Sequence, residues 1–122
     1  MTDSIATYLR GHRARVARER RLRRARYERA RAQAEAMVVA LVERYPVTRV
    51  WLFGSILDPG RFDERSDIDV ACEGLPPERY LEAFGVLEST GPLPFDLVRV
   101  ESCSPTLAAR IRREGELVHG DP

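Results

Sequence analysis

The sequence predicts a small α/β (α+β) domain in which a short mixed sheet is flanked by helices, with a long Arg-rich N-terminal helix in front of it. Three observations support this prediction. Short runs of apolar and β-branched residues recur at 50–53, 66–72 and 94–100, each of strand length. A helical pattern that starts with Pro-Pro separates the second run from the third. No Pro interrupts residues 1–45, where Ala and Arg, two good helix formers, dominate.

The N-terminal part of the chain has an uneven distribution of charge. Residues 1–36 hold eleven Arg and four acidic residues, a net charge of +7, whereas residues 37–122 hold nine Arg and fifteen acidic residues, a net charge of −6. We expect one long helix over residues 4–44, or two stacked helices with a weak break near Gly11. From residue 30 onward an i, i+3, i+4 stripe should pack on the sheet, and it comprises Ala34, Met37, Val38, Leu41, Val42 and Tyr45.

Residues 1–36 are therefore predicted to form an Arg-rich N-terminal helical extension, and residues 37–122 a folded domain. The extension has too little apolar surface to form a deep core. Three interpretations of it stay open: a solvated helix, a docking element for a partner such as an acidic protein surface, or a nucleic-acid contact through its clustered Arg side chains.

The turn after the first predicted strand has the features of a phosphate-binding site. The apolar run 50–53 predicts a buried strand that stops at Gly54. Glycine permits a tight turn and lets a phosphate approach the backbone. If a helix begins at Ser55, its unpaired N–H groups and its positive dipole end face the same place, and the hydroxyl adds one more donor. Gly54 and Ser55 are thus candidates for holding a triphosphate.

Asp67 and Asp69 are candidate metal ligands. They stand at i and i+2 in a predicted strand over residues 66–72, so both carboxylates should lie on one face of the sheet. Two like charges this close repel each other unless a cation lies between them or one is protonated. Magnesium is the natural candidate, because it takes oxygen ligands and is usually held by one or two carboxylates together with substrate phosphates.

Asp96 is a third candidate ligand, in the middle of the predicted strand at 94–100. An unpaired charge among apolar neighbours is costly to bury, and a position beside Asp67 and Asp69 near a metal ion removes that cost. Three carboxylates can hold two ions, one on the triphosphate and one that activates the attacking oxygen.

The remaining segments complete the predicted scaffold. Residues 76–88 are expected to form a crossover helix between two strands, residues 104–113 a helix capped by Ser104-Pro105, and residues 116–119 a short strand. The N-terminus has no apolar signal region, and the longest apolar run, 36–42, cannot span a bilayer, so we expect a cytoplasmic protein without a membrane partner. Cys72 and Cys103 lack zinc-site spacing and are expected to be reduced thiols.

Taken in order, these features resemble the minimal nucleotidyltransferases (MNT) of the polymerase-β superfamily, and in particular the antitoxin component of HEPN/MNT toxin–antitoxin systems. The resemblance covers residues 37–119 and rests on the strand ending in Gly54-Ser55, on Asp67-Ile68-Asp69, and on Asp96 in its Phe-Asp-Leu-Val context. It implies a polymerase-β-like nucleotidyltransferase fold for residues 37–122. It also implies that Gly54 and Ser55 bind nucleotide phosphates, while Asp67, Asp69 and Asp96 are catalytic and metal-binding.

The resemblance further implies an activity. An MNT antitoxin is a Mg²⁺-dependent protein adenylyltransferase, which uses ATP as substrate, two Mg²⁺ ions, and a tyrosine hydroxyl of its cognate HEPN ribonuclease toxin as acceptor. We therefore expect AMPylation of a toxin, with ATP and the toxin as partners. Two alternatives stay open: nucleotidyl transfer to a small molecule, and a catalytically silent antitoxin or RNA-binding module. One departure from the family pattern is the loop after Ser55, which is one residue longer and lacks the family's Arg at that turn.

Overall fold

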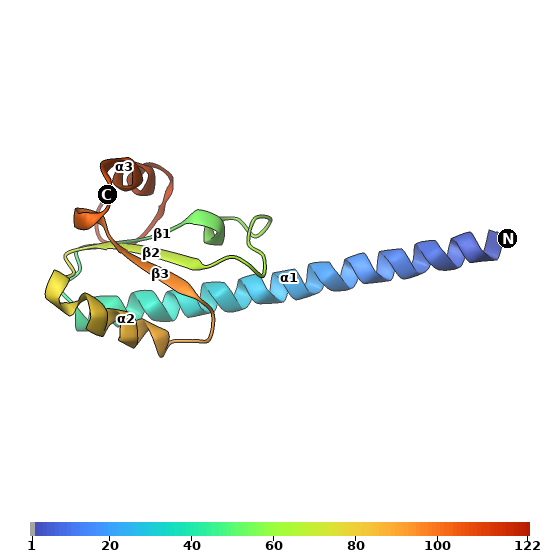
Figure 1. Ribbon diagram of the computed structural model, residues 1–122, viewed down its shortest axis with the longest axis horizontal. Coiled ribbons are helices and arrows are strands. Elements are labelled where there is room, and N and C mark those ends of the chain that lie inside the picture. Colours follow the sequence, from blue (N-terminus) through green and yellow to red (C-terminus); the bar gives the residue numbers. More distant parts are fainter. Residues whose placement is uncertain (1) are drawn as a thin grey trace.

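The computed structural model describes residues 2–122 and has the predicted α+β architecture (Figure 1). In chain order, the helices and strands are α1 (Thr2–Arg44), β1 (Arg49–Phe53), β2 (Ile68–Glu73), α2 (Tyr80–Glu88), β3 (Phe95–Arg99), α3 (Pro105–Glu114) and β4 (Glu116–His119). Short 3₁₀ turns add η1 (Gly54–Leu57), η2 (Pro77–Arg79) and η3 (Val100–Ser102).

The four strands form one mixed sheet in the order β3-β2-β1-β4. Strand β1 is antiparallel to both β2 and β4, whereas β2 and β3 are parallel. A parallel pair needs a crossover connection, and η2 with α2 provides it over the segment where the sequence predicts a crossover helix. The predicted mixed sheet and its crossover helix are thus confirmed.

Helices cover the two faces of the sheet unequally. Helices α1 and α2 lie on one face, and α3 lies on the other (Figure 1). Because side chains alternate along a strand, Val50 and Leu52 of β1 join the core under α1, whereas Trp51 packs with Ala108 and Ile111 of α3. Helix α3 begins as predicted, since the Ser104 side chain accepts a hydrogen bond from the Leu107 N–H at 3.2 Å.

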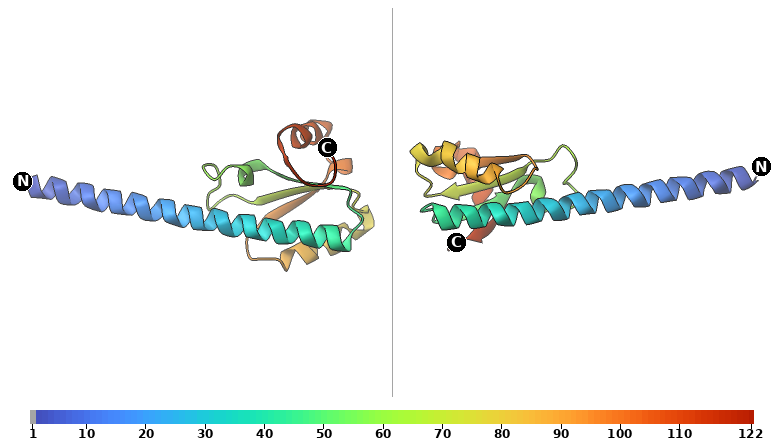
Figure 2. Two further views of the ribbon diagram at one scale, coloured as in Figure 1. Left: turned by 180° about the vertical axis from the view of Figure 1, so that it is seen from behind. Right: turned by 90° about the horizontal axis from the view of Figure 1, so that it is seen from below.

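Helix α1 is one continuous helix, without a break at Gly11. A single glycine costs a helix only about 1 kcal/mol relative to alanine, which is too little to break a helix of good helix formers. Its C-terminal half packs on the sheet through the predicted stripe, of which Ala34, Met37 and Leu41 are completely buried. Its N-terminal half extends beyond the domain, as three views agree (Figures 1 and 2). No helix within residues 2–122 is long and apolar enough to cross a membrane.

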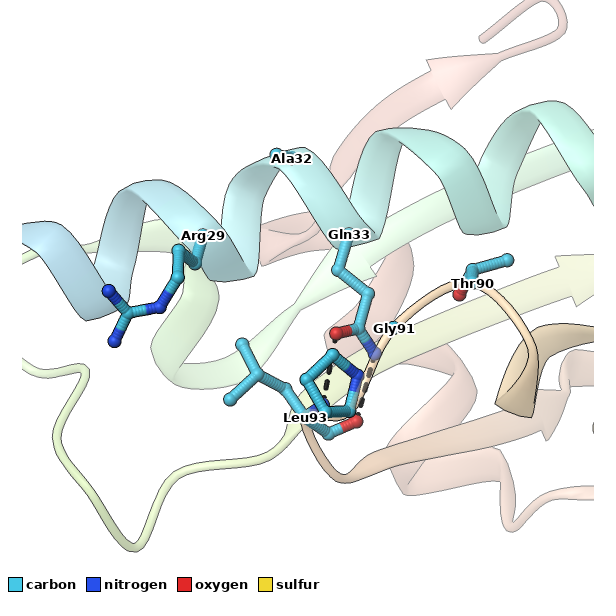
Figure 3. Close-up of a pocket in the computed structure, with 7 residues that line it drawn as sticks. Arg29, Ala32, Gln33, Thr90, Gly91 and Leu93 are labelled. Atoms are coloured by element: carbon cyan, nitrogen blue, oxygen red, sulfur yellow. Dashed lines mark hydrogen bonds between the residues drawn. The ribbon is translucent and has the colours of Figure 1, made fainter.

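Gln33 joins α1 to the loop that leads into β3. It is a buried polar residue, with 6% of its surface exposed. Its side-chain amide donates to the Leu93 carbonyl at 2.9 Å, and its oxygen accepts from the Leu93 N–H at 3.0 Å (Figure 3). The oxygen also lies so close to Gly91 that a side chain there would clash with it. This contact fixes the start of β3 relative to α1, and the sequence pattern did not predict it.

Candidate active site

Asp69 of β2 and Asp96 of β3 are direct neighbours in the sheet. The two strands are parallel and in register there, with Asp69 opposite Asp96 and Ile68 opposite Phe95. Residues opposite each other point to the same face. Asp69 shares that face with Ala71, which packs under α3, so both carboxylates lie on the α3 side of the sheet, at its Ile68 end. The structure confirms the predicted proximity of Asp69 and Asp96.

Asp67 lies just outside the strand in which it was predicted. Strand β2 begins at Ile68. The Ile68 N–H donates to the carbonyl of Pro94, the residue before β3, at 3.0 Å. Asp67 is exposed, whereas Asp69 is half-buried. The prediction of a strand over 66–72 was therefore wrong by two residues at its start, and Asp67 approaches the site from the preceding loop.

Gly54 lies directly against the Asp69 carboxylate. The last residue of β1, Phe53, pairs with Asp69 across the antiparallel ladder. Gly54 follows with a φ of +76°, a left-handed conformation that side chains disfavour. A Cβ at this position would lie 2.5 Å from Oδ2 of Asp69. The turn and the acidic pair are therefore one site, in which the missing side chain leaves room for a carboxylate.

The electrostatics of the site are dominated by Asp69. Burial of its carboxylate, followed by repulsion from Asp96 and then from Asp67, raises the pKa of Asp69 from 3.8 to about 6. All three causes disfavour the ionised form. A bound cation would remove the repulsion and lower the pKa again. The other two acids identified in the sequence thus both act on the Asp69 carboxylate.

Segment η1, which follows Gly54, is a four-residue 3₁₀ turn and not the α-helix considered for Ser55. Its anchor is Ile56, which is completely buried. Helix α1 contacts this turn, since the Tyr27 hydroxyl donates to the Ile56 carbonyl at 2.8 Å. Tyr27 also packs edge-on against the Phe62 ring, with centroids 5.9 Å apart. The sequence pattern assigned no role to Tyr27, and these contacts were not predicted.

The longer loop after Ser55 is held by its own polar groups. The Asp58 carboxylate accepts from the Gly60 N–H at 2.9 Å and so faces its own loop. Asp63 accepts from the Arg65 N–H at 2.8 Å. Helix α1 again contributes, because the Arg26 guanidinium donates to the carbonyls of Asp63 (3.4 Å) and Glu64 (3.1 Å). This loop connects the glycine turn to Asp67, so α1 fixes both of its ends.

The acidic side chains of the site do not form a complete metal-binding set on their own. Within residues 2–122, no set of three or more His, Cys, Asp and Glu side chains is arranged to hold a metal ion by itself. The binding of two ions by three carboxylates therefore stays a prediction. Magnesium, however, is usually bound by one or two carboxylates with the remaining ligands from water and substrate phosphates. The hard oxygen donors of Asp69 and Asp96, and the repulsion between them, fit that kind of site.

The fold and the arrangement of the site define the class of protein. Residues 37–121 match the sequence model of the family described as polymerase beta, nucleotidyltransferase. The protein belongs to this family, which confirms the resemblance seen in the sequence. No curated protein matches the chain.

Solved structures with a similar fold come from toxin–antitoxin complexes. One is a toxin–antitoxin crystal structure with AMP-PNP, at 26% identity and a TM-score of 0.61, covering 71% of this chain and 73% of the other. Another is the toxin–antitoxin MntA-HepT, at 24% identity and a TM-score of 0.57, covering 73% and 71%. A third holds a tri-AMPylated Shewanella oneidensis HEPN toxin with its MNT antitoxin, at 23% identity and a TM-score of 0.58, covering 75% and 73%. The last two show the fold alone.

Proposed function

We propose that the protein is an antitoxin that transfers AMP from ATP to a tyrosine hydroxyl of a cognate HEPN ribonuclease toxin. The observation that carries this proposal is the arrangement at one end of strands β1, β2 and β3, where Gly54 lies against Asp69 and Asp69 lies opposite Asp96. Membership of the nucleotidyltransferase family supports the reaction class. The similar complex with AMP-PNP, an ATP analogue, supports ATP as the nucleotide and a toxin as the partner.

In this proposal Gly54 and Ser55 hold the β and γ phosphates. The first N–H groups of a helical turn have no partner within the turn, and they point toward an anion placed there. Gly54 leaves the backbone accessible, and the Ser55 hydroxyl adds a donor. The hydrogen bond from Tyr27 to Ile56 keeps these donors in place before the nucleotide arrives, which is the preorganisation that catalysis by electrostatic stabilisation needs.

The three carboxylates have two different roles in this proposal, metal binding and activation of the acceptor. Asp67 and Asp69 are the proposed Mg²⁺ ligands, and Asp96 is proposed to lie at the acceptor. Bound Mg²⁺ would neutralise charge on the triphosphate and on the departing oxygen. The backbone of Asp69 is paired on both sides, with β1 and with β3, which fixes where its carboxylate leaves the sheet. Asp67 is exposed on the preceding loop and can adjust to the nucleotide.

The proposed reaction is a single displacement at the α-phosphorus. The acceptor oxygen forms a bond to that phosphorus, the bond from the α-phosphorus to the bridging oxygen breaks, and pyrophosphate leaves. Asp96 orients the acceptor hydroxyl and accepts its proton. Asp96 suits this role because it is exposed on the open edge of the sheet, where a protein acceptor can reach it. No covalent enzyme intermediate is needed.

The proposal is tested by pyrophosphate release. The protein is incubated with Mg²⁺, the product of the neighbouring gene, and ATP, GTP, CTP or UTP in separate reactions. We expect release with ATP that requires both proteins, and loss of release with Asp96→Ala while ATP binding is retained. A tight complex that inhibits the partner without releasing pyrophosphate from any nucleotide would instead establish a catalytically silent antitoxin.

A further inference from the structure

The N-terminal half of α1 carries a dense positive charge. We define the arm as residues 4–24, most of which extend beyond the domain (Figures 1 and 2), while its last turn, with Arg23, borders the loop around Asp63. The arm holds eight Arg and one Glu, a net charge of +7. Within the described part of the chain, only Arg24 of these eight forms an ion pair, with exposed Glu28 at 3.2 Å. Most of this charge is therefore available to a partner.

The partner that this charge favours is a polyanion. Side chains three or four positions apart are neighbours on a helix, so pairs such as Arg20 and Arg24 repel each other. A second arm laid alongside the first would add the same charge, which disfavours pairing between two copies. An anion along the arm relieves the repulsion, and contact with phosphates also releases the counterions of a nucleic acid.

The Arg side chains surround the arm and do not form a single stripe. Successive residues of an α-helix are separated by about 100° around its axis. On this geometry Arg13 and Arg20 lie on one side, and Arg15 and Arg18 lie about 180° away, on the opposite side. All four are exposed. A flat partner would contact one of these sides only, whereas the two walls of a groove would contact both.

We propose that the arm binds duplex DNA by lying in its major groove, with Arg on both sides contacting the phosphates of the two strands. An α-helix with its side chains is about 10–12 Å across, and the major groove is about 12 Å wide. The arm's 21 residues span about 31 Å, close to one turn of B-form DNA. The major groove of A-form RNA is too deep and narrow for this placement.

The charge of the rest of the protein fits the same arrangement. Residues 37–122 carry a net charge of −6, so the domain repels DNA and confines the contact to the arm. Arg26 and Tyr27 at the base of the arm hydrogen-bond to the segment between β1 and β2, which fixes the direction in which the arm leaves the domain. Contacts to phosphates carry little sequence information, so the binding is expected to be general for duplex DNA.

The test uses the full chain and a fluorescently labelled 20-base-pair DNA duplex, with binding followed by anisotropy at several salt concentrations. Two double variants remove the same charge from opposite sides of the arm: Arg13→Gln with Arg20→Gln, and Arg15→Gln with Arg18→Gln. Each double should weaken binding about tenfold or more at 100 mM salt and reduce the slope of log K against log salt by about 2. Glutamine is a good helix former, and circular dichroism should show unchanged helix content.

The matched control removes two Arg from α3, Arg110→Gln with Arg113→Gln, and should leave the affinity within about twofold of the wild type. Four results would overturn the proposal. They are a loss confined to one of the two arm doubles, an equal loss in the α3 control, equally tight binding to duplex RNA, and no binding to DNA at 50 mM salt. The last result would leave an acidic protein as the arm's partner.

Discussion

The carboxylate of Asp69 lies in the space that a side chain on Gly54 would need, 2.5 Å from the position of such a Cβ. The contact joins two parts of the chain that the sequence separates by a long loop. Two factors therefore favour glycine at position 54. A side chain would collide with the Asp69 carboxylate, and a φ of +76° is disfavoured for residues with a side chain. Substitution of this glycine should therefore affect both folding and activity.

We predict that Gly54→Ala lowers the free energy of unfolding by about 1–3 kcal/mol, because the added methyl group is strained and displaces Asp69. AMP transfer should fall below detection. The control is Gly85→Ala in α2, where nothing lies within 4 Å of an added Cβ, and which should stabilise the protein by about 0.5–1 kcal/mol. Urea denaturation measures both. A Gly54→Ala protein with wild-type stability and activity would show that the contact is dispensable.

A second prediction concerns pH in the absence of metal. The pKa of Asp69 is raised from 3.8 to about 6 in the folded protein, so folding favours proton uptake. The resulting stabilisation is complete below pH 3.8 and is lost as the pH rises through 6. Asp69→Asn cannot ionise, so it should be more stable than the wild type at pH 7.5 in EDTA and should lose this part of the pH dependence.

Thermal unfolding at pH 5 and pH 7.5 provides the measurement. Addition of Mg²⁺ should stabilise the wild type at pH 7.5 and leave Asp69→Asn nearly unchanged, because the variant keeps the shape of the side chain but loses the charge that binds the ion. If Asp69→Asn were less stable than the wild type at pH 7.5 without metal, the cost of ionising Asp69, which comes first from its burial and then from repulsion by Asp96 and Asp67, would not be the dominant effect at this position.

The third prediction tests the support of the glycine turn by α1. Tyr27→Phe removes the hydrogen bond to the Ile56 carbonyl and keeps the ring contact with Phe62. We expect a loss of about 0.5–1.5 kcal/mol in stability, together with a higher KM for ATP, since the phosphate donors are held less firmly. Tyr8→Phe is the control, because Tyr8 is 67% exposed on the arm. Equal kinetics for the two variants would argue against a positioning role for Tyr27.

A fourth prediction separates the arm from the core. Deletion of residues 2–24 should leave the free energy of unfolding within about 0.5 kcal/mol of the full chain, because surface segments contribute little. Deletion of residues 2–34 also removes buried Ala30 and Ala34 and both hydrogen bonds of Gln33. That deletion should cost at least about 2 kcal/mol. Comparable effects of the two deletions on urea unfolding would mean that the arm is part of the folded core.

Much of the fold could be predicted because its signals are local. The apolar run 50–53 and the alternation along 66–72 depend only on neighbouring residues, and so does the capping of α3 by Ser104. The same local pattern placed Asp69 and Asp96 on strands. Their adjacency follows once β2 and β3 are paired in parallel, which the crossover helix indicates.

The contacts that complete the site could not be predicted in this way. Tyr27 reaches Ile56, and Gln33 reaches Leu93, across long stretches of chain. Nothing in the local pattern marks them, because the partners of both side chains lie far away in the sequence. The 3₁₀ geometry of η1 and the position of Asp67 before β2 likewise depend on how α1 holds the loop between them.

Transfer of AMP to the toxin is measured most directly as the intact mass of the partner toxin after incubation with this protein, ATP and Mg²⁺. We expect a mass increase of one or more AMP units with the wild type. We expect no increase with Asp69→Asn or Asp96→Ala, although both variants should remain folded and bind the toxin. An unmodified toxin in the wild-type reaction, or full modification by Asp69→Asn, would contradict the assignment of this carboxylate pair as the site of nucleotidyl transfer.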